Sequence, residues 1–181
     1  QVKKFLSLKS LCKTLRSKNK IRISSHIDFW LKKISNEKQK SIRRGRFETD
    51  IKNGKRTFDI VKYPLYSYQQ AGMMHLAFNE RALLADEMGL GKTVQAIAAC
   101  ELLRQTKNIK KVLIIAPASL KAEWEEQITK FSDLSCIIIQ GTRKDRLKLY
   151  QVEAFFYLTN YEQIRYDGAD IQRLIMPDII I

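Results

Sequence analysis

The amino-acid sequence predicts an α/β fold, a parallel β-sheet flanked by helices, preceded by a basic and mainly helical N-terminal region. Short, continuously apolar runs alternate with amphipathic segments after residue 60, which is typical of parallel strands buried between helices. Charge separates the two regions: residues 1–60 carry 18 basic and 5 acidic side chains, whereas residues 61–181 carry 15 and 14. We therefore expect a basic lead-in over 1–60 and an α/β domain over 61–181.

Two helices and a hairpin are expected in the lead-in. Apolar residues recur at helical spacing from Phe5 to Leu15, which predicts a first helix. Ser24 or Ser25 is a candidate N-cap for a second helix, which we expect to end near Gly45. Asn53 and Gly54 form a turn signal between apolar stretches, so a small hairpin is predicted there, with a domain boundary near residue 60.

The α/β region has a clear order of elements. Apolar runs of strand length predict strands at 83–85, 112–116, 136–139, 155–158 and 179–181. Helical patterns occupy 93–104 and 120–131, and a further helix follows Gln69. Because each strand is apolar throughout, both faces of the sheet should be covered.

Composition excludes several classes of protein. With 181 residues, 45% of them apolar, the chain can bury a sizeable core. Its three cysteines lie far apart, which excludes a disulfide framework or a zinc ribbon and suits a reducing compartment. No apolar run approaches the roughly 18–20 residues that span a bilayer, so no membrane partner is expected.

A glycine-bearing turn between a strand and a helix is the sharpest functional signal. Gly89 and Gly91 allow the backbone to turn and to expose N–H groups, and the following helix adds the positive end of its dipole. Lys92 is expected to reach the β and γ phosphates of ATP, and the Thr93 hydroxyl to ligate Mg²⁺. The whole candidate cradle comprises Asp86, Glu87, Met88, Gly89, Leu90, Gly91, Lys92 and Thr93.

This loop resembles the first motif of a known family. Residues 86–97, which begin Asp-Glu-Met-Gly-Leu-Gly-Lys-Thr, resemble that motif in the Swi/Snf-like ATPases, double-stranded DNA translocases of helicase superfamily two. The general phosphate-loop pattern has Gly where this chain has Asp86, and the family accepts Asp there. The resemblance implies a RecA-like fold. Residues 65–72 resemble the adenine-side motif, which implies that Gln69 binds the adenine edge, although Tyr66 and Ser67 depart from the Arg-Pro often found there.

Two further stretches resemble the motifs that touch DNA in this family. Residues 112–124 resemble a strand followed by a Pro-x-Ser-Leu turn and a helix, which implies that Ser119 and Lys121 contact the tracked strand. Ser119 is expected at the helix N-cap, where free N–H groups suit a phosphate oxygen. Residues 158–162 resemble the third DNA-side motif and imply contacts from Thr159 and Tyr161. A plain helix cap and a plain polar turn are the structural alternatives.

The resemblance also implies what the chain lacks. Residues 177–181 resemble the strand that leads into an Asp-Glu box, which in this family holds Mg²⁺ and activates water. We therefore expect a truncated first motor lobe from a bacterial-type, cytoplasmic, nucleoid-associated protein. The intact parent would be a DNA-dependent ATPase that works on double-stranded DNA and on protein complexes bound to it. The fragment alone would be inactive without the box and without a second lobe that supplies an arginine finger.

Three other functions stay open. Residues 1–60, with aromatic side chains among the basic ones, could form a nucleic-acid-binding module without motor activity. A related motor could act on RNA or on single strands. A small-molecule kinase would leave the motifs around Gln69, Ser119 and Thr159 as coincidences.

Overall fold

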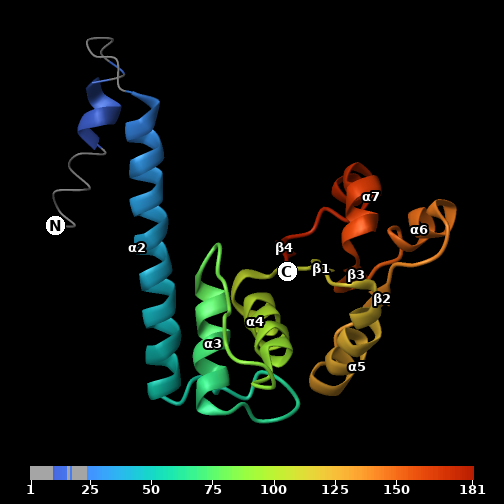
Figure 1. The fold of residues 1–181 in the computed structure, drawn as a ribbon. Helices are drawn as coiled ribbons and strands as arrows, with labels where there is room; N and C mark the ends of the chain where they lie inside the picture. Colours follow the sequence, from blue (N-terminus) through green and yellow to red (C-terminus); the bar gives the residue numbers. More distant parts are fainter. Residues whose placement is uncertain (1–9, 16, 18–23) are drawn as a thin grey trace. The chain divides into compact units, whose positions relative to one another are not determined.

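The computed structural model describes residues 10–15, 17 and 24–181 (Figure 1). The chain divides into two compact units, Gln1–Asp50 and Ile51–Ile181, which are described separately below. In the first unit, residues 10–15 are helical; the remainder of the predicted helix from Phe5 lies outside the described residues.

Helix α2, Ser25–Lys52, is longer than the sequence predicted. Ser24 caps it, because its hydroxyl oxygen accepts from the backbone N–H of His26 at 3.3 Å. The predicted end near Gly45 is wrong. A single glycine costs only about 1 kcal/mol inside a helix. The ion pair between Arg44 and Glu48, 2.8 Å long, spans Gly45 on the helix surface and stabilises the helix there.

The predicted hairpin around Asn53 and Gly54 is also wrong. The turn exists, but it ends α2: Gly54 adopts φ of +68°, and its N–H donates to the carbonyl of Ile51 at 3.0 Å. Residues 53–66 contain no strand. A left-handed glycine serves a helix end as well as a hairpin, and here the preceding residues already form a helix.

The second unit is a four-stranded parallel sheet with helices on both faces, as predicted. Its strands are β1 (Val112–Ile115), β2 (Cys136–Ile138), β3 (Phe156–Thr159) and β4 (Ile179–Ile180), in the order β2-β3-β1-β4. Val112 is paired with Phe156 on one side and with Ile179 on the other. The helical elements are α3 (Ser67–Phe78), α4 (Lys92–Lys107), the short 3₁₀ helix η1 (Ala118–Leu120), α5 (Lys121–Phe131), α6 (Arg143–Leu149) and α7 (Tyr161–Leu174).

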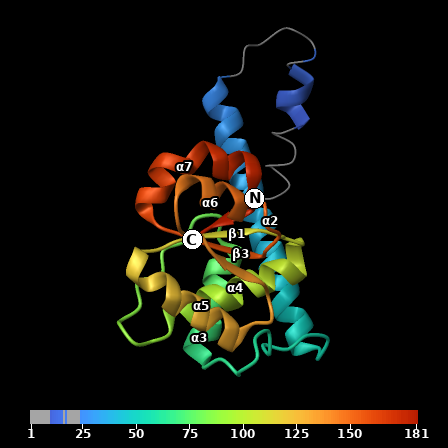
Figure 2. The ribbon, with the colours of Figure 1, turned by 90° about the vertical axis from the view of Figure 1, so that its right-hand side faces the viewer.

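Helices α6 and α7 lie on one side of the sheet and α4 and α5 on the other (Figure 2). On the α6–α7 side, Leu113 and Tyr157 pack with Ile171 and Ile175 in a fully buried cluster. The neighbouring residues along each strand alternate to the opposite face. Both faces of the central strands β1 and β3 are therefore buried, which explains their continuous apolar runs.

The sequence did not indicate α6 or α7, although each carries a capping signal. Thr142 caps α6 in a reciprocal capping box with Asp145, and Asn160 caps α7 in the same way with Gln163. Both helices are rich in charged residues, so their apolar stripes are short. The capping residues therefore indicate these two helices better than their apolar spacing does.

The predicted strand at 83–85 is wrong. These residues form neither helix nor strand, and Leu83 is 83% exposed. A strand is defined by backbone hydrogen bonds to a neighbour, and the described sheet contains only β1 to β4. A short apolar run therefore does not by itself predict a paired strand.

Candidate nucleotide site and nucleic-acid interface

The loop before α4 has the geometry of a phosphate cradle. Gly89 and Gly91 adopt φ of +84° and +70°, in the left-handed region that glycine occupies without strain. A Cβ on Gly91 would lie 2.7 Å from Nε2 of Gln69, so the approach of these two segments also requires glycine. Gly91 is the N-cap residue of α4, and the positive end of this four-turn helix therefore opens onto the loop.

Lys92 is the first residue of α4 and lies over the loop. Its Nζ donates to the carbonyl oxygens of Asp86 at 2.9 Å and Glu87 at 2.8 Å. Thr93 follows in the first turn of the helix and is half-buried. An ammonium and a hydroxyl thus stand together at a helix N-terminus, the arrangement that binds a polyphosphate and its metal ion.

Asp86, which replaces the usual glycine, has a structural partner that the sequence reasoning missed. Its Oδ2 accepts from Nε2 of Gln95 at 2.9 Å, and the same Nε2 lies 3.3 Å from the carbonyl oxygen of Leu90. Gln95 is fully buried on α4, and its Oε1 lies 1.7 Å from the position that a Cβ on Gly72 would take. Helix α3 therefore makes room for Gln95, which braces both ends of the loop.

Gln69, the predicted adenine ligand, also contacts the loop. Its Nε2 lies 3.4 Å from the carbonyl oxygen of Leu90, and its Oε1 accepts from the backbone N–H of Tyr66 at 3.1 Å. Tyr66 and Tyr68 stack with ring centroids 5.8 Å apart, and both rings are exposed. The start of α3 thus offers an aromatic surface beside the loop, which suits a planar base.

The remaining members of the cradle, Glu87, Met88 and Leu90, are exposed on the loop. Met88 is almost completely accessible, so it has no packing role in the described fold. The structure thus brings Gln69 and residues 86–93 together, and the binding roles predicted for them stay predictions.

The turn after β1 differs from the expectation in one respect. Ser119 is exposed, but it lies inside η1, and the N-cap residue of α5 is Leu120. The predicted N-cap role of Ser119 is therefore wrong, because one turn of 3₁₀ helix precedes α5. Lys121 is 8% exposed, and its Nζ donates to the carbonyl of Ile139 at 2.6 Å.

Charge around Lys121 is unfavourable for an ammonium. Burial lowers the pKa of Lys121, and the positive charge of Arg146 lowers it further, while Glu162 raises it. The side chain is directed into the protein and lies away from solvent. It is thus placed differently from Ser119, two residues earlier.

The turn after β3 likewise combines one buried and one exposed candidate residue. Thr159 is fully buried, and its hydroxyl donates to Oε1 of Gln163 at 2.9 Å. Tyr161 begins α7 and is 61% exposed. The backbone N–H of Ala116 donates to the carbonyl of Thr159 at 3.0 Å, so the turns after β1 and β3 are neighbours. Of the four predicted DNA-binding residues, Ser119 and Tyr161 face solvent and Lys121 and Thr159 do not.

A buried charge network joins α6 to α7. Arg146 donates to both carboxylate oxygens of Asp167, at 2.5 and 3.0 Å, and the Tyr150 hydroxyl donates to the same carboxylate at 2.8 Å. The Arg146 hydrogen bond lowers the pKa of Asp167 despite its burial, and burial raises the pKa of Tyr150. Arg146 also donates to the carbonyl of Gly141 at 3.0 Å, which holds the loop after β2.

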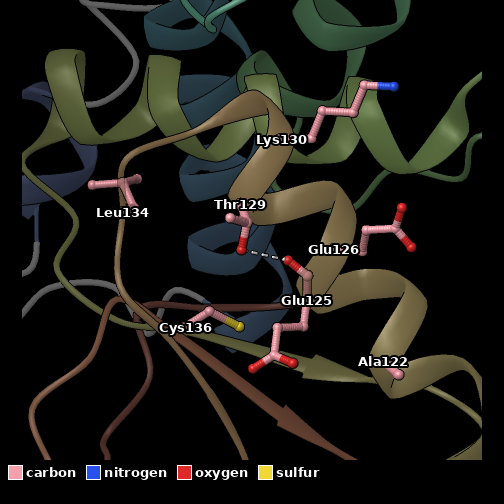
Figure 3. Close-up of a pocket in the computed structure, with 7 residues that line it drawn as sticks. All are labelled: Ala122, Glu125, Glu126, Thr129, Lys130, Leu134 and Cys136. Atoms are coloured by element: carbon pink, nitrogen blue, oxygen red, sulfur yellow. Dashed lines mark hydrogen bonds between the residues drawn. The ribbon is translucent and has the colours of Figure 1, made fainter.

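An open pocket of about 520 Å³ lies between α5 and β2, and none of the predicted site residues lines it (Figure 3). Within it the Thr129 hydroxyl donates to the carbonyl of Glu125 at 2.9 Å. Burial, with a smaller contribution from Glu125, raises the pKa of the Cys136 thiol to about 12. Ala122, Glu125, Glu126, Thr129, Lys130, Leu134 and Cys136 line the pocket.

The described residues hold no cluster of three or more His, Cys, Asp or Glu side chains that could bind a metal ion. None of the helices among them is both long enough and apolar enough to cross a bilayer.

A parallel sheet between helices, with a glycine loop that opens onto a helix N-terminus, defines a P-loop nucleotide-binding lobe of the RecA-like type. The sequence profile of the SNF2-related domain matches residues 68–181. The chain therefore belongs to the SNF2-related family.

Relatives in several kingdoms share this region. The chain is 46% identical over 88 residues to the chromatin-remodeling ATPase INO80 of Schizosaccharomyces pombe, which covers 45% of this chain and 6% of that protein. It is 35% identical over 128 residues to the ATP-dependent helicase BRM of Arabidopsis thaliana, covering 65% of this chain and 6% of that protein. The Sulfolobus solfataricus SWI2/SNF2 ATPase core in complex with dsDNA superposes with a TM-score of 0.54 at 31% identity, covering 60% of this chain and 24% of that chain.

These relatives correct one prediction. The expected bacterial, cytoplasmic location is wrong, because the curated relatives named here are eukaryotic, several are named for chromatin remodelling, and chromatin lies in the nucleus. The chain spans a small part of the relatives it matches, 6% of the first two.

Proposed function

We propose that this chain binds ATP and Mg²⁺ as part of a motor that hydrolyses ATP and moves on double-stranded DNA. The observation that carries the proposal is the phosphate loop, in which Lys92 and Thr93 begin α4 beside Gln69. Membership of a family whose relatives include ATPases and a core in complex with dsDNA supports it. The protein complexes that such a motor would move on DNA belong to the same proposal.

The residues of the loop suit the nucleotide. The N-terminus of α4 and the Lys92 ammonium would hold the phosphates, and Gln69 with the Tyr66–Tyr68 surface would lie on the base side. Mg²⁺, when bound, would neutralise charge that develops on the phosphate oxygens, and the Thr93 hydroxyl is the group in this loop suited to ligate it. The Lys92 ammonium must leave the carbonyls of Asp86 and Glu87 to reach a phosphate.

Turnover by these 181 residues alone is proposed to be absent. Asp178, the acidic residue beside β4, uses one carboxylate oxygen to accept the backbone N–H groups of Lys110 and Lys111, at 2.7 and 3.0 Å. It therefore acts as a structural brace for β1 and β4. ATP hydrolysis by this chain above roughly 0.1 s⁻¹, which is far below common enzyme rates, would contradict the proposal.

ATP binding can be tested with one pair of variants. Lys92→Ala should weaken ATP affinity at least ~10-fold, about 1.4 kcal/mol, because a charged contact to phosphate is lost. Lys110→Ala removes the same charge from an exposed site beyond α4 and should leave affinity unchanged. Titration calorimetry with ATP and Mg²⁺ measures both. Equal affinities for the two variants would refute the role of the loop.

DNA contact can be tested on α7. Tyr161 and Tyr166 are both exposed on this helix, but only Tyr161 lies at the turn after β3. Tyr161→Ala should weaken duplex binding several-fold, whereas Tyr166→Ala should not. The same titration with duplex RNA separates a DNA motor from the RNA-dependent alternative, since tighter RNA binding would favour the latter.

A second candidate function rests on α2. Phe29 and Trp30 are exposed on this helix next to the exposed Lys32 and Lys33, and aromatic rings among cations suit nucleic acid. A binding module without motor activity would then explain duplex affinity. Under that reading Phe29→Ala and Trp30→Ala together abolish duplex binding while Tyr161→Ala has no effect.

A further inference from the structure

The backbone carbonyl of Ile139 accepts hydrogen bonds from two side chains in different parts of the chain. Ile139, which follows β2, is fully buried, and its carbonyl oxygen accepts from Nζ of Lys121 at 2.6 Å and from Nε2 of Gln163 at 3.2 Å. Lys121 is the first residue of α5, and Gln163 lies in the first turn of α7. The carbonyl therefore joins the starts of two helices that are 40 positions apart in sequence.

Each donor belongs to a turn that presents an exposed side chain. Lys121 directly follows η1, which carries Ser119. Gln163 holds the turn after β3 through its Oε1, which accepts the Thr159 hydroxyl at 2.9 Å and lies 3.3 Å from the backbone N of Asn160. A continuous set of hydrogen bonds thus runs from the Ser119 turn through Ile139 to the turn that begins with Thr159 and carries Tyr161.

The order of the strands shows what this carbonyl adds. In the sheet β3 lies between β1 and β2. The backbone bond from Ala116 to Thr159 aligns the ends of β1 and β3, and the backbone N–H of Ile139, which donates to the carbonyl of Leu158 at 2.8 Å, aligns the end of β2 with β3. Lys121, which follows β1, reaches the Ile139 carbonyl, so its side chain links the segments after β1 and β2 directly, across the strand that separates them.

Lys121 is poorly suited to bind a phosphate directly. Its side chain is buried, and a phosphate contact would require the ammonium to leave the Ile139 carbonyl. The charges of Arg146 and Glu162 act on the pKa of the ammonium in opposite directions. A buried cation is stable only with its hydrogen-bond acceptor in place, and so the Lys121–Ile139 bond is a fixed part of the fold.

We propose that Lys121, Gln163 and the Ile139 carbonyl form a clamp that sets the distance between the Ser119 and Tyr161 turns, so that both turns meet one nucleic-acid strand. Lys121 is then a positioning residue and makes no contact with DNA. The role of the clamp rests on the proposed binding of duplex DNA at these turns, whereas the coupling of the two turns exists without DNA.

The test compares Lys121→Met and Gln163→Met, which keep side chains of similar length without the donors, with Lys130→Met, which removes an exposed charge from the same helix α5. Duplex affinity of the full chain is measured across a range of salt. Both clamp variants should lose about 5- to 10-fold in affinity, with an unchanged slope of log affinity against log salt. The double variant should lose much less than the product of the two, because either change opens the clamp.

Opposite outcomes overturn the proposal. A slope smaller by about 0.9 in Lys121→Met, with no effect of Gln163→Met, would make Lys121 a phosphate contact. Unchanged affinity in both variants would remove the clamp from DNA binding. If Lys121→Met folds poorly, Lys121→Arg retains a donor for the carbonyl and should restore affinity, and failure of this rescue in a folded protein would also count against the clamp.

Amide hydrogen exchange without DNA separates the clamp from the proposed function. Gln163→Met should accelerate exchange at Leu120, whose N–H bonds the carbonyl of Pro117 at 2.9 Å, and Lys121→Met should accelerate exchange at Asn160. An unchanged remote amide in both variants would overturn the clamp. If each variant accelerates exchange at the remote amide but the wild-type chain binds no duplex, the proposed DNA binding is overturned. The coupling of the two turns through the clamp would then still hold.

Discussion

Replacement of Asp167 by Asn should cost this protein more stability than any other loss of a single charge on α7. The Asp167 side chain is fully buried and accepts two hydrogen bonds from Arg146 and one from the Tyr150 hydroxyl. The variant keeps the shape of the side chain but removes its charge and presents an NH₂ group toward a donor. Arg146, whose side chain is only 14% exposed, would be left without its counter-ion.

The magnitude follows from that geometry. Removal of one partner from a buried ion pair costs about 3–5 kcal/mol, because the remaining charge stays buried. Arg146 keeps its bond to the Gly141 carbonyl and has some access to water, so we expect the lower end, about 3 kcal/mol. For a protein of this size that corresponds to a fall of roughly 6–12 °C in Tm.

The control lies one turn further along the same helix. Asp170 pairs with Arg143 at 2.8 Å and with Arg173 at 3.1 Å, but these arginine side chains are 63% and 72% exposed. Asp170→Asn should therefore cost less than about 1 kcal/mol. Urea unfolding followed by circular dichroism measures both midpoints. Equal losses for the two variants, or a changed m value in Asp167→Asn, would refute the reasoning.

The pH dependence gives a second check on the same group. Since the Arg146 hydrogen bond holds the pKa of Asp167 below its ordinary value near 3.9, the folded state binds its proton less tightly than the unfolded state. The contribution of Asp167 is then complete above about pH 4 and disappears as the pH falls through the folded-state pKa. The difference in unfolding free energy between wild type and Asp167→Asn should therefore shrink as the pH falls below about 4. A difference that stays constant with pH would contradict the lowered pKa of Asp167.

The remaining predictions concern glycines and thiols. Gly72→Ala places a Cβ 1.7 Å from Oε1 of Gln95, so it should destabilise the protein by about 1–3 kcal/mol and weaken ATP binding, as thermal unfolding and calorimetry would show. Gly45→Ala meets open space inside α2 and should raise helix content and stability by up to about 1 kcal/mol; a loss would contradict the helical assignment there. Burial raises the pKa of the Cys100 and Cys136 thiols to about 12, so iodoacetamide at pH 8 should alkylate both far more slowly than a free thiol, which peptide mass spectrometry can follow.

Local pattern was enough for the phosphate loop and for most of the sheet. Glycines at 89 and 91, followed by Lys92 and Thr93, indicate a left-handed turn and a helix start, and the structure has both. Strands β1 and β3 were recognisable because a strand buried on both faces is apolar at every position. Strands β2 and β4 were recognisable from apolar runs of strand length, although β2 is only partly buried and Ile180 of β4 is 62% exposed. The parallel arrangement of the strands followed from the helices between them.

Local pattern failed where one residue type serves two structures. The Asn53–Gly54 turn ends a helix, although the same pair can close a hairpin, and the choice depends on residues that lie before it. The run at 83–85 belongs to no described strand, because pairing requires a neighbouring strand that the run itself does not encode.

The sequence by itself determined the turn before α4, the family and the α/β class, because the patterns that indicate them lie in residues close together in the chain. Only the tertiary structure decided which candidate side chains face solvent. Lys121 turns inward to a carbonyl 18 positions away, and Asp86 finds its partner in Gln95 only because Gly72 on α3 leaves space. Hydrogen bonds between distant segments compete with the local conformational preference of a residue. When the polar group is buried, these hydrogen bonds decide the conformation, because an unpaired buried polar group costs more free energy than a rearranged turn.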